Sequence, residues 1–228
     1  MNLLALETAT ECCSVALMAD DRVIVRSELA PRRHADLLLP MCDEVLGEAG
    51  IARSDLDFVA VGRGPGAFTG VRLAVSAAQG IALALGIPVL PVSSLAALAM
   101  QAPDNGAEIL AVIDARMGEV YAGRFRRIDA RVEALSEESV GPATALRFDG
   151  SDAVNVIGTG WSSYRDAIVA NLRTAPVWSE GARYPQAADV ARLAAPVAAS
   201  GGGVAADRVL PVYLRDKVAL TIAEQRRH

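Results

Sequence analysis

The chain has 228 residues, of which 52% are hydrophobic and 21% are charged, and its formal net charge is −5. A chain of this length and composition can bury the core of one large domain or two small ones, which excludes an intrinsically disordered protein. The acidic balance also excludes a protein that binds nucleic acid independently through an overall basic surface.

Three strands are predicted at the start of the chain, before helices and strands begin to alternate. The strands are expected over residues 3–6, 14–18 and 22–27, with polar turns between them. The alternating elements are then expected in this order: a helix over about 33–48, a strand over 56–61, a helix over about 70–85, a strand over 89–92 and a helix over 93–100. Ser93 or Ser94 is expected to cap the last helix. This pattern is typical of a mixed α/β sheet.

The second half of the chain repeats the pattern of the first. Residues 102–106, with the sequence APDNG, are predicted to link the two halves. The stretches LLALETATECCSVAL (3–17) and LAVIDARMGEVYAGR (110–124) each contain an apolar strand, an acidic residue at its end, a short polar turn and a second strand. The acidic residues are Glu7 and Asp114. We therefore predict an internal duplication of one α/β unit.

This duplication divides the chain into an N-terminal lobe at 1–103 and a C-terminal lobe at 107–228. The later elements are expected to be a strand over 154–157, helices near 162–172 and 187–199, a flexible break at 200–203 and an extended segment over 211–215.

The stretch GRGPGAFTGVR, residues 62–72, contains four glycines where a strand is expected to pass into a helix. It lacks the lysine of the G-x-x-x-x-G-K-[ST] phosphate loop, and its glycine spacing differs from G-x-G-x-x-G. Gly64, Gly66 and a capping Thr69 could still bind an anion at the start of the helix. The alternative, which we favour, is a tight crossover in which glycines supply unusual dihedral angles and close packing.

Glu7, Thr8 and Asp114 are the candidate cofactor-binding residues at the repeated strand ends. In a duplicated fold the two carboxylates could face one cleft, where they could hold Mg²⁺ with a nucleotide or share acid–base chemistry. Alternatively, each carboxylate accepts hydrogen bonds from its own turn. Neither turn has the run of glycines and hydroxyl groups expected of a tight phosphate loop, which favours the second interpretation.

Two of the predicted helices are apolar over more of their surface than one sheet covers easily. The 33–48 helix has a wide apolar arc, in which Pro40 is expected to cause a kink or a new start, and the 70–85 helix is apolar on two faces. Small residues on the second helix would let another helix approach closely. We expect a partner or oligomer interface here, the alternative being a deeper core within the chain. The expected interface residues are Leu37, Leu38, Met41, Val45, Leu73, Ser76, Ala77, Gly80 and Ala84.

The sequence favours a cytoplasmic protein without a membrane span. The uncharged stretch 73–103 is long enough to cross a bilayer, but glycine and proline near residues 86–91 divide it into a helix, a strand and a second helix. The first residues do not resemble a signal peptide. The three cysteines, Cys12, Cys13 and Cys42, are interpreted as buried thiols in a reducing compartment.

Histidine is scarce, because His34 and His228 are the only two in the chain. A histidine-based zinc site or a Ser–His–Asp triad would have to use His34, which lies beside Arg32 and Arg33 at an expected helix start. We interpret His34 as a solvated or capping residue. The sequence therefore predicts neither a metal site nor a catalytic residue.

Four segments of the chain together resemble the bacterial TsaB family, also called YeaZ. They are LLALETATECCSVAL, GRGPGAFTGVRLA, VIDARMGEVYAG and PVYLRDKVA, and they occur in the family's order over nearly the whole chain. The resemblance implies a duplicated actin-like (ASKHA, ribonuclease-H-like) α/β fold with two lobes, the second reduced. Many members of the family have Asp at the position of Glu7.

The resemblance also implies a function. TsaB proteins are cytoplasmic, non-catalytic scaffold subunits of the machinery that makes N6-threonylcarbamoyladenosine at position 37 of tRNA. They pair with the transferase TsaD, are joined by the ATPase TsaE and depend indirectly on TsaC. The two over-apolar helices would form the TsaD interface, or a homodimer when the chain is alone. No intrinsic cofactor is expected, although ATP or ADP could bind at the junction with TsaD, and tRNA would bind only through the complex.

One comparison of motifs supports a non-catalytic protein. In TsaD proteins the equivalent strand is followed by an H-M-E-G-H metal motif, whereas this chain has SLAAL at residues 94–98. Ser94 and Leu98 therefore stand where the two metal-binding histidines would be, and they cannot clamp a metal ion as imidazoles do. The alternatives are an actin-like ATPase or kinase that binds nucleotide between the lobes and, less favoured, a peptidase.

Overall fold

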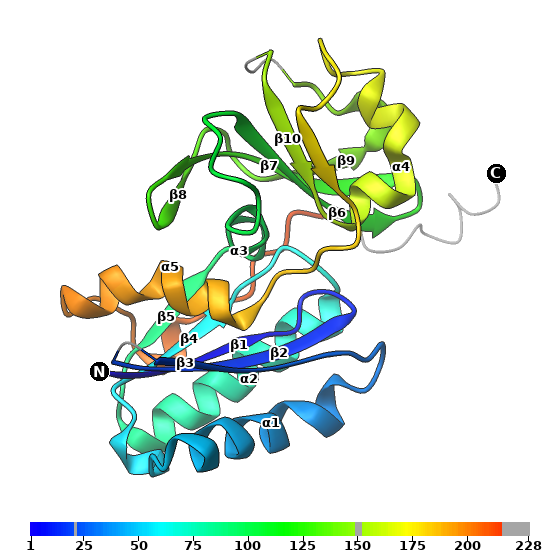
Figure 1. Cartoon of the computed structure of the whole chain (residues 1–228). Coiled ribbons are helices and arrows are strands. Elements are labelled where there is room, and N and C mark those ends of the chain that lie inside the picture. Colours follow the sequence, from blue (N-terminus) through cyan, green and yellow to red (C-terminus); the bar gives the residue numbers. More distant parts are fainter. Residues whose placement is uncertain (21, 149–151, 216–228) are drawn as a thin grey trace, which may run out of the picture.

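The computed structural model describes residues 1–20, 22–148 and 152–215. Within them, two β-sheets lie one above the other, each forming the centre of a lobe (Figure 1). The first sheet has the strand order β3-β2-β1-β4-β5, in which β2 is antiparallel to β1 and β3, while β4 is parallel to β1 and β5. Its strands are β1 (Asn2–Glu7), β2 (Cys12–Ala19), β3 (Arg22–Leu29), β4 (Phe58–Gly62) and β5 (Val89–Val92).

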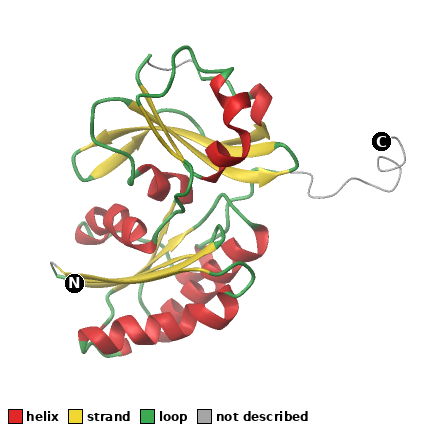
Figure 2. Cartoon of the chain, turned by 45° about the vertical axis from the view of Figure 1, so that its right-hand side comes forward, coloured by secondary structure: helices red, strands yellow, loops and turns green. Residues whose placement is uncertain are grey.

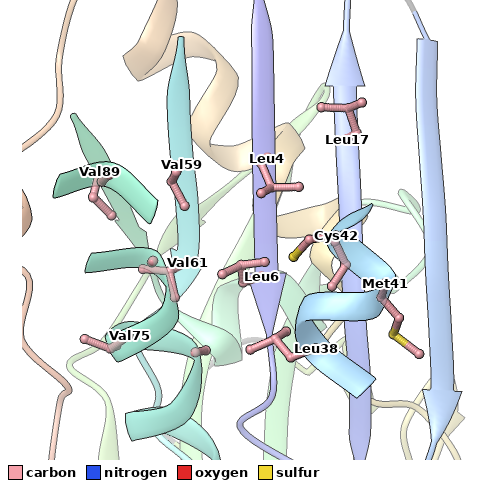
Figure 3. Packing of buried hydrophobic residues seen from close by; sticks show 14 of the residues in the cluster. Leu4, Leu6, Leu17, Leu38, Met41, Cys42, Val59, Val61, Val75 and Val89 are labelled. Carbon is pink, nitrogen blue, oxygen red and sulfur yellow. The ribbon is translucent and has the colours of Figure 1, made fainter. Parts of the chain in front are cut away.

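The central strand β1 is buried on both faces because helices cover both sides of the first sheet. Leu4 and Leu6 point toward α1 (His34–Ala49) and α2 (Phe68–Leu85), as Figure 3 shows. Leu3 and Ala5 point the other way and pack against α5 (Ala187–Ala199). A continuous apolar run is the sequence pattern of a strand covered on both faces.

Capping residues in the sequence explain where two of the helices begin or end. Gly50, with φ of +69°, ends α1 in the left-handed conformation that glycine adopts easily. The side chain of Ser93 accepts a hydrogen bond of 3.1 Å from the amide of Ala96 and so caps α3 (Ser94–Ala99), as expected. α1 continues through Pro40, so the new helix start considered there is wrong. Pro40 is exposed, so water can satisfy the carbonyl that loses its amide donor.

The second sheet repeats the topology of the first. Its order is β11-β10-β6-β7-β8, in which β6 is antiparallel to β7 and parallel to β10. Its strands are β6 (Glu108–Arg116), β7 (Glu119–Ile128), β8 (Arg131–Ala134), β10 (Val154–Ile157) and β11 (Trp178–Glu180), and β9 (Ser139–Pro142) pairs with β7. β6, β7, β8, β10 and β11 therefore correspond to β1, β2, β3, β4 and β5, which confirms the duplicated actin-like, ribonuclease-H-like fold.

The second lobe is reduced. Between β8 and β10 it has β9 and the short 3-10 helix Ala143–Ala145 where the first lobe has the long helix α1. One face of its sheet packs against α4 (Thr159–Val169), through Leu110, Val112 and Trp161. The helix expected near 162–172 thus begins three residues earlier, and β8, β9 and β11 are strands that the sequence pattern did not indicate.

The two halves exchange helices. Helix α3, from the first half, packs its Leu95 and Leu98 against Ile109 and Ile113 of the second sheet. Helix α5, from the second half, covers the first sheet. Both helices therefore lie between the two sheets, while α1 and α2 cover the outer face of the first sheet (Figures 1 and 2). The expected boundary at 103–107 separates the two sheets, but the helices that cover them cross it.

Helix α2 is long and apolar enough to cross a membrane by length and composition alone. Its Val71, Ala74, Val75, Ala78 and Ala82 are buried in the core of the first lobe. The same length and composition are found in helices that pack against the sheets of globular proteins.

Candidate functional site

The carboxylate of Glu7 is completely buried at the end of β1. Its Oε1 accepts a hydrogen bond of 2.7 Å from the amide of Ala9, and its Oε2 accepts one of 2.7 Å from the hydroxyl of Ser94. Burial raises the pKa of the Glu7 carboxyl, an effect that these two hydrogen bonds oppose. Glu7 thus connects its own turn to the start of α3. Its side chain is not among the residues that line the cavity between the lobes, which is described below.

The glycines from the end of β4 to the first turn of α2 let this stretch pack directly against the end of β1 and the turn that follows it. A Cβ atom added at Gly62 would lie 2.0 Å from Oε2 of Glu7, and one added at Gly66 would lie 2.2 Å from the carbonyl oxygen of Ala9. A Cβ at Gly70 would lie 2.0 Å from the carbonyl oxygen of Thr8. Backbone and side chains of the turn therefore occupy the space beside this stretch, as in the structural crossover that the sequence favoured.

The other candidates in this stretch have structural contacts. The hydroxyl of Thr8 donates a hydrogen bond of 2.6 Å to the carbonyl of Gly70. Gly64 has φ of +92°, and its carbonyl accepts a hydrogen bond of 3.0 Å from the amide of Ser94. The expectation that Thr69 caps α2 is wrong, because the helix starts at Phe68, two residues earlier than expected, and Thr69 lies exposed within the first turn.

Asp114 occupies the equivalent place in the second lobe. Its Oδ1 accepts a hydrogen bond of 2.7 Å from the amide of Arg116, two residues on, as Glu7 does from Ala9. The hydroxyls of Ser163 and Tyr164 donate to the same carboxylate at 3.0 and 3.1 Å. Both repeated acidic residues are thus held by their own turns, and Asp114 receives further bonds from α4.

A small cavity lies between the two repeated turns. Its volume is about 250 Å³, and its lining includes Glu11, Phe68, Asp114, Arg116, Tyr213 and Arg215. The guanidinium of Arg116 pairs with the carboxylates of both Glu11 and Asp114, so it joins the two lobes across this cavity. The cavity is below the usual 300–1,000 Å³ of small-molecule sites. The expected common cleft is thus lined by Asp114, whereas Glu7 is buried outside it.

A larger cavity of about 610 Å³ lies at the starts of α1 and α2. Thr10 and His34 line it, and both Oγ1 of Thr10 and Nε2 of His34 are buried without a hydrogen-bond partner among the described residues. Arg32 and Arg116 also line this cavity. The unpartnered buried polar atoms and the two helix starts give this cavity free hydrogen-bonding groups and a field that favours an anion.

The expected interface residues of α1 and α2 fall into two groups, one buried and one exposed or partly exposed. Leu38, Met41 and Val45 are buried at 1%, 6% and 0% exposure in the core of the first lobe, so their assignment to an accessible surface is corrected. The wide apolar arc of α1 is explained mainly by packing on the sheet and on α2. The remaining candidates are exposed or partly exposed: Leu37, Leu73, Ser76, Ala77, Gly80 and Ala84.

A groove of about 380 Å³ runs between the two helices. Leu39 of α1 and Gly80, Ile81 and Ala84 of α2 line it. Leu39 is 55% exposed, and Leu83 of α2 is 77% exposed. Leu39 belongs to the apolar arc expected from the sequence but was not among the expected interface residues, and Leu83 was not singled out from the sequence.

Ser94 and Leu98 have structural roles that explain their side chains. Ser94 is buried and donates to Glu7, and Leu98 is buried against the second sheet. Among residues 1–20, 22–148 and 152–215, no group of three or more His, Cys, Asp or Glu side chains is placed to hold a metal ion.

The cysteines are buried, as expected. Burial raises the pKa values of the Cys13 and Cys42 thiols to about 12.

The sequence is similar to known proteins over most of its length. A family model described as TsaD, tRNA N6-adenosine threonylcarbamoyltransferase, matches residues 24–221. The chain is 38% identical over 228 residues to the tRNA threonylcarbamoyladenosine biosynthesis protein TsaB of Escherichia coli (strain K12), covering 96% of each chain. It is 36% identical over 229 residues to the protein of the same name from Haemophilus influenzae, covering 96% of this chain and 95% of that one.

Solved structures agree with this similarity. YeaZ from Pseudomonas aeruginosa matches with a TM-score of 0.86 and 42% identity, over 93% of this chain and 99% of its own. A protein described as uncharacterized, with similarity to peptidase YEAZ from Pseudomonas aeruginosa, matches with a TM-score of 0.86 and 43% identity, over 94% of this chain and 99% of its own. Because these TsaB relatives match over 96% of the chain and the repeated sheets are present, the chain belongs to the TsaB (YeaZ) family.

Proposed function

We propose that this chain is a non-catalytic scaffold subunit in the synthesis of tRNA N6-threonylcarbamoyladenosine, and that it binds the transferase TsaD through the outer face of α1 and α2. The observation that carries the proposal is the apolar groove on that face, in a chain matched over 96% of its length by TsaB of Escherichia coli. The relative's name supplies the reaction, and the groove supplies the physical means of binding.

The composition of the groove suits a partner helix. Gly80 and Ala84 lie one turn apart on α2, and both are exposed, so a second helix could approach the backbone of α2 closely. Leu39, which lines the groove, would lose its exposed apolar surface on binding, at about 25 cal/mol per Å² removed from water. In the isolated chain the same face would serve a homodimer.

The proposed lack of catalysis rests on the contacts at the strand ends. Glu7 is buried and bonded to Ala9 and Ser94, so it is unavailable to a substrate. Ser94 and Leu98 stand where the partner family has metal-binding histidines, and both are packed into the core. An ATPase or kinase would need the interlobe cavity, which is small and is lined by the bridge of Arg116 to Glu11 and Asp114.

The remaining parts of the proposal concern the assembly. TsaE would join the pair, TsaC would supply the activated group, and tRNA would be held by the complex, which acts in the cytoplasm. The cavity at the starts of α1 and α2 supports binding of ATP or ADP at the junction with TsaD. Thr10 and His34 offer it unpartnered polar atoms, and the helix starts favour negative charge.

The TsaD interface is tested by Ala84→Arg. Ala84 is exposed in the groove, so the long charged side chain should leave the fold intact while it blocks a close helix contact. We expect the affinity for TsaD, measured by titration calorimetry, to fall at least about tenfold, which corresponds to about 1.4 kcal/mol. Modification of tRNA by the reconstituted complex should fall with it.

Ala199→Arg is the matched control, because Ala199 is also an exposed alanine of a helix but lies at the end of α5, away from the groove. It should leave TsaD binding unchanged. Equal affinities for the wild-type chain and the Ala84→Arg variant would refute the interface, and an equal loss in both variants would show that the effect is unrelated to the groove.

A further inference from the structure

Residues 204–215, here called the C-terminal strap, are attached along the first lobe; they contain the short 3-10 helix Ala206–Arg208 and are otherwise without helix. Val204 forms an antiparallel bridge with Val89 at the edge of the first sheet. Val209 is buried in the core, and its carbonyl accepts a hydrogen bond of 3.0 Å from the side chain of Gln79 on α2. The amide of Val212 donates to the carbonyl of Arg63 at 2.9 Å.

The end of the strap reaches both sides of the interlobe cavity. The Tyr213 ring lies 5.4 Å from the ring of Phe68, and the guanidinium of Arg72 contacts both rings and donates to the Tyr213 hydroxyl. Two residues later, the guanidinium of Arg215 pairs with Glu119 and donates a hydrogen bond of 3.0 Å to the carbonyl of Ala115, in the second lobe. The strap therefore links the first turn of α2 to the β6–β7 turn.

The contacts between the lobes differ in kind on the two sides of the molecule. On one side they are apolar and buried, because α3 and α5 lie between the sheets (Figure 1). The chain passes between the lobes after α3 and again before α5. These two connections also meet, since the side chain of Gln101 donates a hydrogen bond of 2.8 Å to the carbonyl of Tyr184. Around the interlobe cavity the contacts are polar and partly exposed: the Arg116–Glu11 pair and the end of the strap. Exposed ion pairs are weak, whereas separating buried apolar surface is costly.

We propose that the C-terminal strap is a latch across the interlobe cavity. The lobes are hinged where α3, α5 and the two connections between the lobes meet. On the opposite side, Arg215 binds the second lobe from the end of the strap, which Tyr213 anchors against Phe68 and Arg72 of the first lobe. Loss of these two contacts opens the cavity without unfolding either lobe, because their side chains are partly exposed while Val209 keeps the strap anchored in the core.

Interlobe distances measured with spin labels test the latch. Asp36→Cys and Met117→Cys place labels on exposed positions of the two lobes, and the native cysteines are buried. Each labelled protein is mixed with an excess of unlabelled protein, so that distances between labels on two different molecules do not contribute. In the double variant Tyr213→Ala/Arg215→Ala we expect the longer-distance population to rise about tenfold, as the loss of two partly exposed contacts allows. The control is Leu210→Ala, in the same strap but 69% exposed.

Two results would overturn the latch. One is an unchanged distance distribution in the double variant, and the other is an equal change in the Leu210→Ala control. Circular dichroism and thermal unfolding establish that each variant is folded. If the double variant fails to fold, Arg215→Ala alone, which removes only the contacts to Ala115 and Glu119, should still lengthen the distances and give faster hydrogen exchange in the β6–β7 turn. Its failure to do so would equally reject the proposal.

Discussion

At the scale of single residues, the glycines after β4 are required by close approach. Gly62 faces the side chain of Glu7 at the end of β1, and Gly66 and Gly70 face the backbone of the turn that follows, at distances that no Cβ atom could occupy. Gly80, in the following helix, has open space where its side chain would be. Glycines near one another in the sequence therefore have opposite energetic roles.

Alanine substitutions separate these roles. Gly62→Ala should lower the free energy of unfolding by about 1–3 kcal/mol or more, because the new Cβ overlaps the buried Glu7 carboxylate. Gly80→Ala should raise it by about 0.5–1 kcal/mol, because alanine is the better helix residue at an open, exposed position. Urea unfolding of both variants measures the difference. A stable Gly62→Ala protein would contradict the packing described here.

The buried Glu7 predicts a dependence of stability on pH. Its pKa is raised in the folded chain, so between the unfolded value near 4.5 and the higher folded value the folded state binds more protons than the unfolded state. Stability from this group therefore falls as pH rises through that range. Glu7→Gln has no such titration and keeps an acceptor for the Ala9 amide.

The stability of Glu7→Gln relative to the wild-type chain should thus increase from pH 4.5 to pH 8. Urea unfolding at several pH values gives this difference directly, since other titrating groups are common to both proteins. A constant difference across the range would mean that the carboxyl titrates alike in the folded and unfolded chains.

At the scale of elements, α1 shows that a wide apolar arc need not be an interface. Leu38, Met41 and Val45 are buried between α1 and the first sheet, as Figure 3 shows for Leu38 and Met41, whereas the adjacent Leu39 is 55% exposed. A charge at Leu38 would therefore disrupt the core before it could test any partner.

Leucine-to-alanine substitutions at neighbouring positions test this division of α1. Leu38→Ala should lower the free energy of unfolding by about 2–5 kcal/mol, because it leaves a cavity in the core. Leu39→Ala should change it by less than about 0.5 kcal/mol. Thermal or urea unfolding measures both, and similar losses in the two variants would disprove the assigned burial.

At the scale of the whole molecule, the exchange of helices makes the two lobes interdependent. Helix α3 covers the second sheet, and α5 covers the first, so neither lobe has its complete core within its own half of the chain. Such contacts join residues far apart in the sequence, and they favour cooperative unfolding of the two lobes. The proposed opening of the interlobe cavity is compatible with this interdependence, because it leaves the α3 and α5 contacts intact.

The sequence by itself determined most of the elements and the duplication, because apolar periodicity, caps and turn residues are local signals. Its glycine stretch also indicated a crossover, whereas the SLAAL segment was interpreted as a missing metal motif through the family resemblance. Only the tertiary structure decided which leucines of α1 are buried, where α3 and α5 pack, and that Arg116 and Arg215 join the lobes. These features depend on contacts between distant segments, and one helical pattern is compatible with either a sheet or a partner on its apolar side.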